Sequence, residues 1–144
     1  MRIAIGSDHG GFRLKKEIIQ HLKDKGIEYT DLGTYDEKSV DYPDFGRAVG
    51  EAVASGKFER GIVICGTGIG ISIAANKVPG IRAALCGDCF SAKASREHND
   101  ANVLALGERV IGTELAKMIV DIWLDTKFAG GRHKNRVDKL NNMW

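Results

Sequence analysis

The amino-acid sequence of 144 residues predicts an α/β fold in which helices cover both faces of a five-stranded parallel sheet. Five short apolar runs alternate with segments whose apolar residues recur at helical spacing. The connections between them are short, as in sheets built from successive strand–helix units. Most of the glycines follow the apolar runs, where ligands bind in such folds. We expect one domain, residues 1–144, with a basic helical tail over about 131–144.

The expected strands are the apolar runs at residues 3–5, 27–32, 62–65, 81–85 and 103–106. Most of them are nearly uninterrupted stretches of Ile, Val, Leu and Ala, which is typical of strands buried on both faces. Helical periodicity marks residues 14–22, 45–53 and 115–123. Asp88 is a candidate N-cap for a helix over residues 89–98. A last short helix is expected around residues 133–143, with Val137 and Leu140 facing inward.

Composition excludes several classes of protein. No apolar run approaches the ~20 residues that a membrane span needs, and no signal peptide is recognisable. Three cysteines are too few for a disulfide scaffold, so we expect a cytoplasmic protein. Residues 127–144 hold five Lys or Arg against one Asp, whereas the remaining residues hold 16 against 18. Because this tail has only two aromatic residues on which bases could stack, we expect no nucleic-acid partner. Its positive charge is compatible with binding of an anionic small molecule or with a solvent-exposed chain end.

The first loop after a strand is Gly6-Ser7-Asp8-His9-Gly10-Gly11, directly before a helix. Glycines allow the backbone to approach a ligand, and amides at a helix N-terminus favour an anion. Asp8 and His9 would then face one cleft. The alternative is that Asp8 only caps the helix.

The third strand ends in Cys65-Gly66-Thr67-Gly68-Ile69-Gly70. This loop fails the dinucleotide fingerprint, because Ile71 stands where a glycine is required, and it lacks the Gly-Lys-Ser/Thr of a P-loop. What remains is a nest of backbone amides that suits a phosphate or a developing oxyanion. Amide dipoles also favour the thiolate form of a cysteine, so Cys65 is a candidate base or nucleophile.

The other candidates are less specific. Cys86 and Cys89 open a helix, and a redox pair or a metal site must be considered, although no second pair of ligands has suitable spacing. His98 ends the helix before the last strand, a common place for a structural histidine. Arg132 and Arg136 stand at i and i+4 on one helix face, which suits phosphate recognition or a solvated surface.

Taken together, these motifs resemble the type B ribose-5-phosphate isomerases of the sugar-phosphate isomerase family, which also includes the galactose-6-phosphate isomerase subunits. The resemblance rests on Ser7-Asp8-His9-Gly10-Gly11, Cys65-Gly66-Thr67-Gly68-Ile69-Gly70, His98-Asn99, and Gly131-Arg132-His133 with Arg136. It implies a Rossmann-like αβα sandwich that forms a homodimer or a tetramer and uses no metal or cofactor. The implied reaction interconverts ribose 5-phosphate and ribulose 5-phosphate in the pentose phosphate pathway.

The resemblance also implies a role for each site residue. Cys65 would be the base at C2, His98 would open the furanose ring, and Thr67 would be a further catalytic group. The implied substrate-binding residues are Asp8, His9, Tyr42, Gly66, Thr67, Gly68, Ile69, Gly70, Asn99, Arg109, Arg132 and Arg136. One branch of the family carries a glutamate base where Ile71 stands here, so this chain resembles the cysteine branch.

Two alternatives remain open on the sequence. The substrate could be a six-carbon phosphate, such as allose 6-phosphate or galactose 6-phosphate, or the chain could be a non-catalytic phosphate-binding module. For the enzyme we expect a site shared across a homodimer, with Cys65 from one chain and at least one of His98, Arg132 and Arg136 from the other. Gly46 and Gly50, one helical turn apart, and the short basic tail helix suggest the interface.

Overall fold

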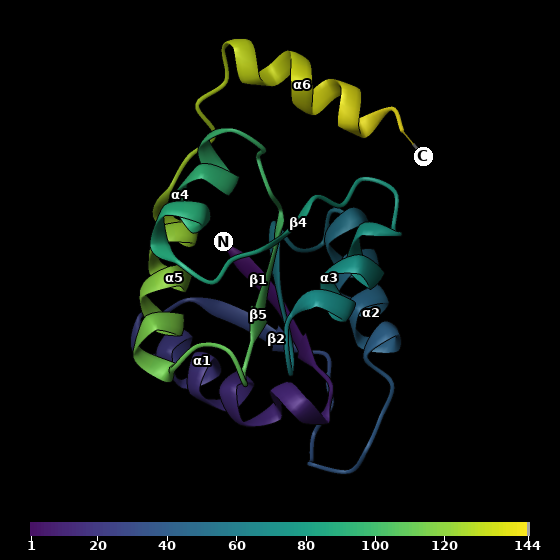
Figure 1. The fold of residues 1–144 in the computed structure, drawn as a ribbon, viewed down its shortest axis with the longest axis vertical. Coiled ribbons are helices and arrows are strands. Elements are labelled where there is room, and N and C mark those ends of the chain that lie inside the picture. The colour runs from purple at the N-terminus through teal and green to yellow at the C-terminus, as the bar shows by residue number, and fades with distance from the viewer. Residues whose placement is uncertain (144) are drawn as a thin grey trace.

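The computed structural model describes residues 1–143 and confirms the predicted α/β fold (Figure 1). All five strands are parallel and lie in the order β2-β1-β3-β5-β4. The strands are β1 (Arg2–Ser7), β2 (Glu28–Asp31), β3 (Arg60–Cys65), β4 (Ala83–Leu85) and β5 (Val103–Gly107). The helices are α1 (Phe12–Asp24), α2 (Tyr42–Ala54), α3 (Ile69–Asn76), α4 (Cys89–Glu97), α5 (Thr113–Asp125) and α6 (Arg132–Asn141).

The sheet separates two apolar cores. Helices α1, α4 and α5 cover one face, and α2 and α3 cover the other (Figure 1). Alternate residues of each central strand enter opposite cores, as the two-residue period of a strand requires. In β3, Ile62 and Ile64 join the first core, whereas Val63 and Cys65 join the second. Cys65 therefore ends its strand on the side of α2 and α3.

The strand order places a switch point between β1 and β3. From β1 the chain moves to β2 on one side, and β3 pairs with β1 on the other. In such sheets a crevice opens at the carboxyl ends of the strands beside the switch point. Here those ends are Ser7 and Cys65, so the two glycine-rich loops singled out by the sequence meet at one edge.

Gly46 and Gly50 do not mark an interface between chains. A Cβ atom on Gly46 would lie 2.8 Å from the carbonyl oxygen of Ile71, and one on Gly50 would lie 3.0 Å from Cγ2 of Val78. Both glycines thus allow α2 to pack closely on α3 and the turn that follows it. The expectation that this pair forms an interface is wrong, because the close approach occurs within the chain.

This packing predicts that Gly46→Ala destabilises the protein. Forcing the two helices apart costs about 1–3 kcal/mol, which exceeds the ~1 kcal/mol that alanine gains over glycine in a helix. We expect a lower free energy of unfolding in urea. Gly87→Ala is the matched control, because a Cβ atom there would meet nothing within 4 Å. Equal stability of the two variants would contradict the close approach.

Helix α6 lies apart from both layers, over the edge of the sheet where the strands begin (Figure 1). The helix expected over residues 133–143 is observed over Arg132–Asn141, and Trp144 lies outside the described residues. Val137 is buried as expected, whereas Leu140 remains 38% exposed. In the part of the chain that the structure describes, no helix combines the length and apolar character that a membrane crossing needs.

Candidate active site

The loop after β1 brings Asp8 against the loop after β3. The Asp8 side chain is buried, and its Oδ1 accepts a hydrogen bond of 3.1 Å from the amide of Gly11, so the residue does cap the short 3₁₀ helix His9–Gly11. A Cβ atom on Gly10 would lie 3.2 Å from the nitrogen of Gly66 and 3.3 Å from Asp8 Oδ1. Asp8 therefore caps the turn and also lies beside the nest of amides.

Cys65 lies at the base of that nest. Its thiol is 5% exposed, and Sγ accepts a hydrogen bond of 3.2 Å from the amide of Gly68. Gly68 has φ +79°, and a Cβ atom there would come within 2.5 Å of Cδ1 of Leu85, so both backbone and space require glycine. Within residues 1–143, the amides of Gly66, Thr67 and Gly70 donate to no other residue. These groups remain available to an anion beside the thiol.

Three further side chains surround the nest. The ring of Tyr42 packs against Gly70, where a Cβ atom would lie 2.5 Å from Cε1. The guanidinium of Arg109 covers Gly66, and the Arg109 amide donates to the Gly66 carbonyl at 2.9 Å. His9 follows Asp8 in the same loop, and its Nδ1 accepts a hydrogen bond of 3.2 Å from the amide of Val40, so Nε2 is the ring nitrogen that can donate.

One chain thus brings together most of the residues that the sequence singled out. They are Asp8, His9, Tyr42, Cys65, Gly66, Thr67, Gly68, Ile69, Gly70 and Arg109. The parallel sheet brings these residues together, because Cys65 is the last residue of β3, and Asp8 and Arg109 closely follow the carboxyl ends of β1 and β5.

The remaining four residues, His98, Asn99, Arg132 and Arg136, lie at the opposite edge. Cys65 is paired with Gly107 at the end of β5, whereas His98 precedes the start of that strand. Five residues at about 3.3 Å each separate the two edges by roughly 15 Å. Within one chain, His98 therefore cannot reach a sugar that touches Cys65.

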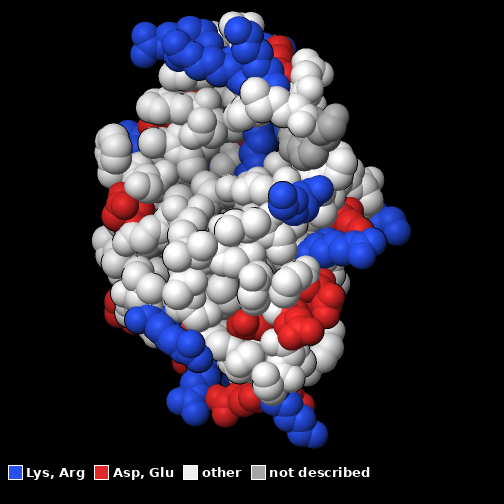
Figure 2. Space-filling model, turned by 45° about the vertical axis from the view of Figure 1, so that its right-hand side comes forward, with Lys and Arg blue, Asp and Glu red and all other residues white. Residues whose placement is uncertain are grey.

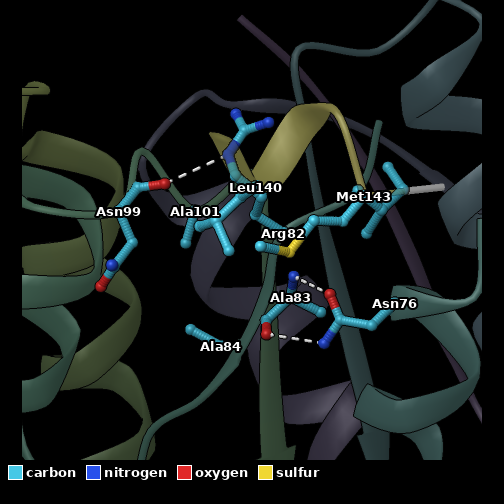
Figure 3. Close-up of a pocket in the computed structure, with 9 residues that line it drawn as sticks. Asn76, Arg82, Ala83, Ala84, Asn99, Ala101, Leu140 and Met143 are labelled. Atoms are coloured by element: carbon cyan, nitrogen blue, oxygen red, sulfur yellow. Dashed lines mark hydrogen bonds between the residues drawn. The ribbon is translucent and has the colours of Figure 1, made fainter. Parts of the chain in front are cut away.

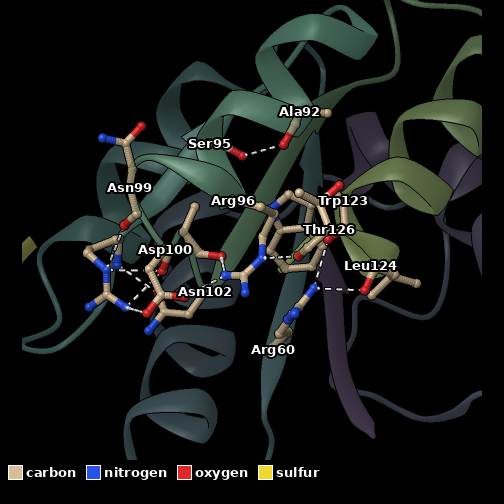
Figure 4. A network of polar contacts seen from close by, with 12 residues as sticks. Arg60, Ala92, Ser95, Arg96, Asn99, Asp100, Asn102, Trp123, Leu124 and Thr126 are labelled. Carbon is tan, nitrogen blue, oxygen red and sulfur yellow. Dashed lines mark hydrogen bonds and ion pairs between the residues drawn. The ribbon is translucent and has the colours of Figure 1, made fainter. Parts of the chain in front are cut away.

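A polar network around the buried Arg96 and the half-buried Arg82 fixes the segment that carries His98 and Asn99 (Figure 4). Arg96 Nη1 donates to Asp100 Oδ1 at 2.9 Å and to the carbonyl of Ala101 at 2.7 Å. Arg82 Nε donates to the carbonyl of Asn99 at 3.1 Å. These bonds hold the turn after α4, in which Asp100 adopts a left-handed conformation with φ +47°.

A groove of about 400 Å³ opens at this same edge, between α6 and the start of β4 (Figure 3). Its walls are mainly apolar, and its lining residues are Asn76, Ile81, Arg82, Ala83, Ala84, Asn99, Ala101, Leu140 and Met143. Cys65 and Asp8 are not among them. This groove is therefore distinct from the nest around Cys65.

The surroundings of Cys86 disfavour the thiolate form that a redox pair uses. Cys86 and Cys89 are both unbonded, and burial raises the pKa of the Cys86 thiol to about 11. Asp88 caps α4 through a hydrogen bond of 2.6 Å from the amide of Ser91, as predicted. Across residues 1–143, no three His, Cys, Asp or Glu side chains gather closely enough to hold a metal ion.

Comparison with known proteins agrees with the motifs. A family model described as Ribose/Galactose Isomerase matches residues 3–140. The chain belongs to this family. Ribose-5-phosphate isomerase B of Escherichia coli is 55% identical over 139 residues, 96% of this chain and 93% of that protein. D-erythrulose-4-phosphate isomerase of Pectobacterium atrosepticum is 48% identical over 142 residues, 97% of this chain and 93% of its own length.

A solved structure of this Ribose/Galactose Isomerase family also superposes closely on the chain. Ribose-5-phosphate isomerase B of Clostridium thermocellum gives a TM-score of 0.98 at 64% identity, covering 99% of this chain and 97% of that one. The α/β fold predicted from the sequence is therefore the fold of the family.

Proposed function

We propose that the chain is an aldose–ketose isomerase that interconverts D-ribose 5-phosphate and D-ribulose 5-phosphate in the pentose phosphate pathway. The observation that carries the proposal is the Cys65 thiol, 3.2 Å from the amide of Gly68 and beside backbone amides that have no acceptor among residues 1–143. A base next to an oxyanion site is what an enediolate intermediate requires. The names of the Escherichia coli and Clostridium thermocellum relatives support the five-carbon substrate.

The reaction then proceeds by proton transfer alone. The Cys65 thiolate takes the proton from C2 of the open-chain aldose, the C1–C2 double bond forms, and O1 gains the negative charge. The amides of Gly66, Thr67 and Gly70 stabilise that charge, and one such donor contributes about 10²–10³-fold to the rate. Thr67 passes the proton of the C2 hydroxyl to O1, and the Cys65 thiol returns its proton to C1, which leaves a ketone at C2.

A second copy of the chain completes the site. The nest offers a base and an oxyanion site, whereas the opposite edge carries His98 for ring opening and Arg132 and Arg136 for the phosphate. Because the two sets lie at opposite edges, a two-fold dimer that apposes them would form two complete sites. Asp8 and Asn99 would orient the sugar hydroxyls, and His9 and Arg109 would assist the arginines.

An apolar surface beside the nest supports this pairing. Ile69 and Ile73, one turn apart on α3, are 53% and 54% exposed, and Leu85 at the end of β4 is 43% exposed. Leu85 packs on Gly68, so the surface adjoins the nest. Figure 2 shows a broad uncharged area across this face, below the basic α6. A homodimer that covers this area is the smallest assembly we propose, and a tetramer would pair two of them.

Phosphate binding supplies energy for the chemistry. Each charged hydrogen bond from an arginine to the phosphate contributes roughly 1.5–3 kcal/mol. This binding energy, remote from the reacting carbons, can hold C1 and C2 against Cys65. We further propose that one domain, residues 1–144, performs the reaction in the cytoplasm, a location that three unpaired cysteines support.

A panel of sugar phosphates in D₂O tests the function. We expect rapid conversion of ribulose 5-phosphate with deuterium at C2 of the aldose product. Allose 6-phosphate and galactose 6-phosphate cover the six-carbon alternative, and D-erythrulose 4-phosphate covers the substrate in the name of the Pectobacterium relative. If deuterium entered none of these compounds, the isomerase proposal would be wrong and the alternative of a non-catalytic phosphate-binding module would be favoured.

His98→Asn should separate ring opening from proton transfer. Loss of the imidazole should slow opening of the cyclic aldose by about 10²-fold or more, as expected for a general acid–base group. Exchange of C2–H in open-chain ribose 5-phosphate should change little. Single-turnover measurements are needed, because at steady state the equilibrium constant fixes the ratio of kcat/KM for the forward and reverse reactions. Equal losses in both steps would remove His98 from ring opening.

A further inference from the structure

His98 makes one side-chain contact that the proposed reaction does not explain. Its ring lies parallel to the ring of His133, with centroids 4.5 Å apart and an interplanar angle of 19°. His98 ends α4, whereas His133 belongs to the first turn of α6. The stack thus joins α4 and α6 through two histidines that are 35 residues apart in the sequence.

The stack is one of several contacts between the C-terminal segment and the rest of the chain, and Val137 of α6 is also buried. Two hydrogen bonds hold the same segment, one of 2.8 Å from Arg82 Nη1 to Asn141 Oδ1 and one of 3.1 Å from the Ala129 amide to the Glu97 carbonyl. The first fixes the far end of α6, and the second fixes the chain just before it. Unlike these two hydrogen bonds, the stack involves the imidazole of His98 itself.

We propose that His133 is a positioning residue for His98, which it holds by stacking so that His98 meets the furanose ring of a sugar bound at the Cys65 loop of a second copy. This inference rests on the proposed function. The backbone of His98 is set by the arginine network, but an exposed imidazole still turns about two side-chain bonds. A flat neighbour at 4.5 Å restricts that rotation.

The surroundings of the stack lower the pKa of His133. Burial lowers the pKa of His133, and the positive charges of His98 on α4 and of Arg132 and Arg136 on α6 lower it further, against the opposite effect of Glu97. Apart from Glu97, these groups therefore favour the neutral form of His133. A neutral ring does not repel His98 when that residue gains a proton during ring opening.

Three variants test the proposal. His133→Ala removes the stack, His133→Phe keeps a flat ring of similar size, and Asn141→Ala is the matched control that removes another anchor of α6. We expect His133→Ala to slow ring opening of cyclic ribose 5-phosphate by roughly 10-fold. This is less than the ~10²-fold loss of rate that displacement of a catalytic group by about 1 Å can cause. C2–H exchange from open-chain substrate should stay within about twofold, because that step uses Cys65. His133→Phe should restore ring opening, and Asn141→Ala should not impair it.

An NMR measurement decides the positioning separately from turnover. The Hε1 signal of His98 carries the ring-current shift of its neighbour, so it should move in His133→Ala and remain displaced in His133→Phe. The proposal is overturned by an unchanged signal in His133→Ala, by failure of His133→Phe to restore ring opening, or by an equal loss in Asn141→Ala. Should the wild-type protein not isomerise ribose 5-phosphate at all, the proposed function fails, and the His98 signal alone decides whether His133 positions that ring.

Discussion

Cys65→Ala should abolish isomerisation while leaving the fold and phosphate binding nearly intact. The side chain ends β3 at the nest, and its removal takes away the base that we assign to C2. A general base contributes about 10²–10⁴-fold, so kcat for ribose 5-phosphate should fall at least 10²-fold. KM should change much less, because the arginines and the amides that bind the phosphate and the oxyanion remain.

Initial rates and circular dichroism check this result. Cys89→Ser is the matched control, since that thiol lies at the start of α4, away from the nest, and should leave most of the activity. Cys86→Ser is a poorer control, because Cys86 is buried in the first core and the serine hydroxyl would pack less well there than the thiol does. If Cys65→Ala kept more than roughly a tenth of wild-type kcat, the assignment of the base would be wrong.

The sequence predicts the nest well because its constraints are local. A buried strand followed by alternating glycines predicts a turn in which the backbone approaches a neighbour, and Gly68 does so with φ +79° against Leu85. The parallel sheet then brings this turn beside Asp8, since both loops follow strand ends. Strand bounds were less accurate, and β4 begins at Ala83 rather than at residue 81.

Contacts between residues that are far apart in the sequence could not be predicted from local sequence patterns. Gly46 and Gly50 have the spacing of a helix contact, but spacing alone does not say whether the other helix belongs to the same chain. Lys15 has the sequence setting of an exposed helical residue, yet its side chain is completely buried. Its ammonium donates to Asp31 Oδ1 at 2.6 Å and to the carbonyl of Thr34, which satisfy the buried charge. Nothing local to Lys15 marks these partners.

The place of His98 could have been predicted from the chain order. A residue that precedes a strand lies at the edge where parallel strands begin, whereas Cys65 is the last residue of its strand and lies where the strands end. The separation of the two residues is thus a consequence of topology. Which side chain packs on His98 depends instead on how α6 folds back, and the sequence contains no periodic signal for the contact with His133.

Mixing two inactive variants tests most directly whether the site is shared between copies. Cys65→Ala and His98→Asn proteins are unfolded together and refolded, or refolded separately as controls. If Cys65 of one copy works with His98 of the other, each mixed dimer has one doubly damaged site and one intact site. Random two-fold pairing makes half of the dimers mixed, so the mixture should regain about a quarter of wild-type activity. No recovery, despite proven exchange of subunits, would contradict the shared site.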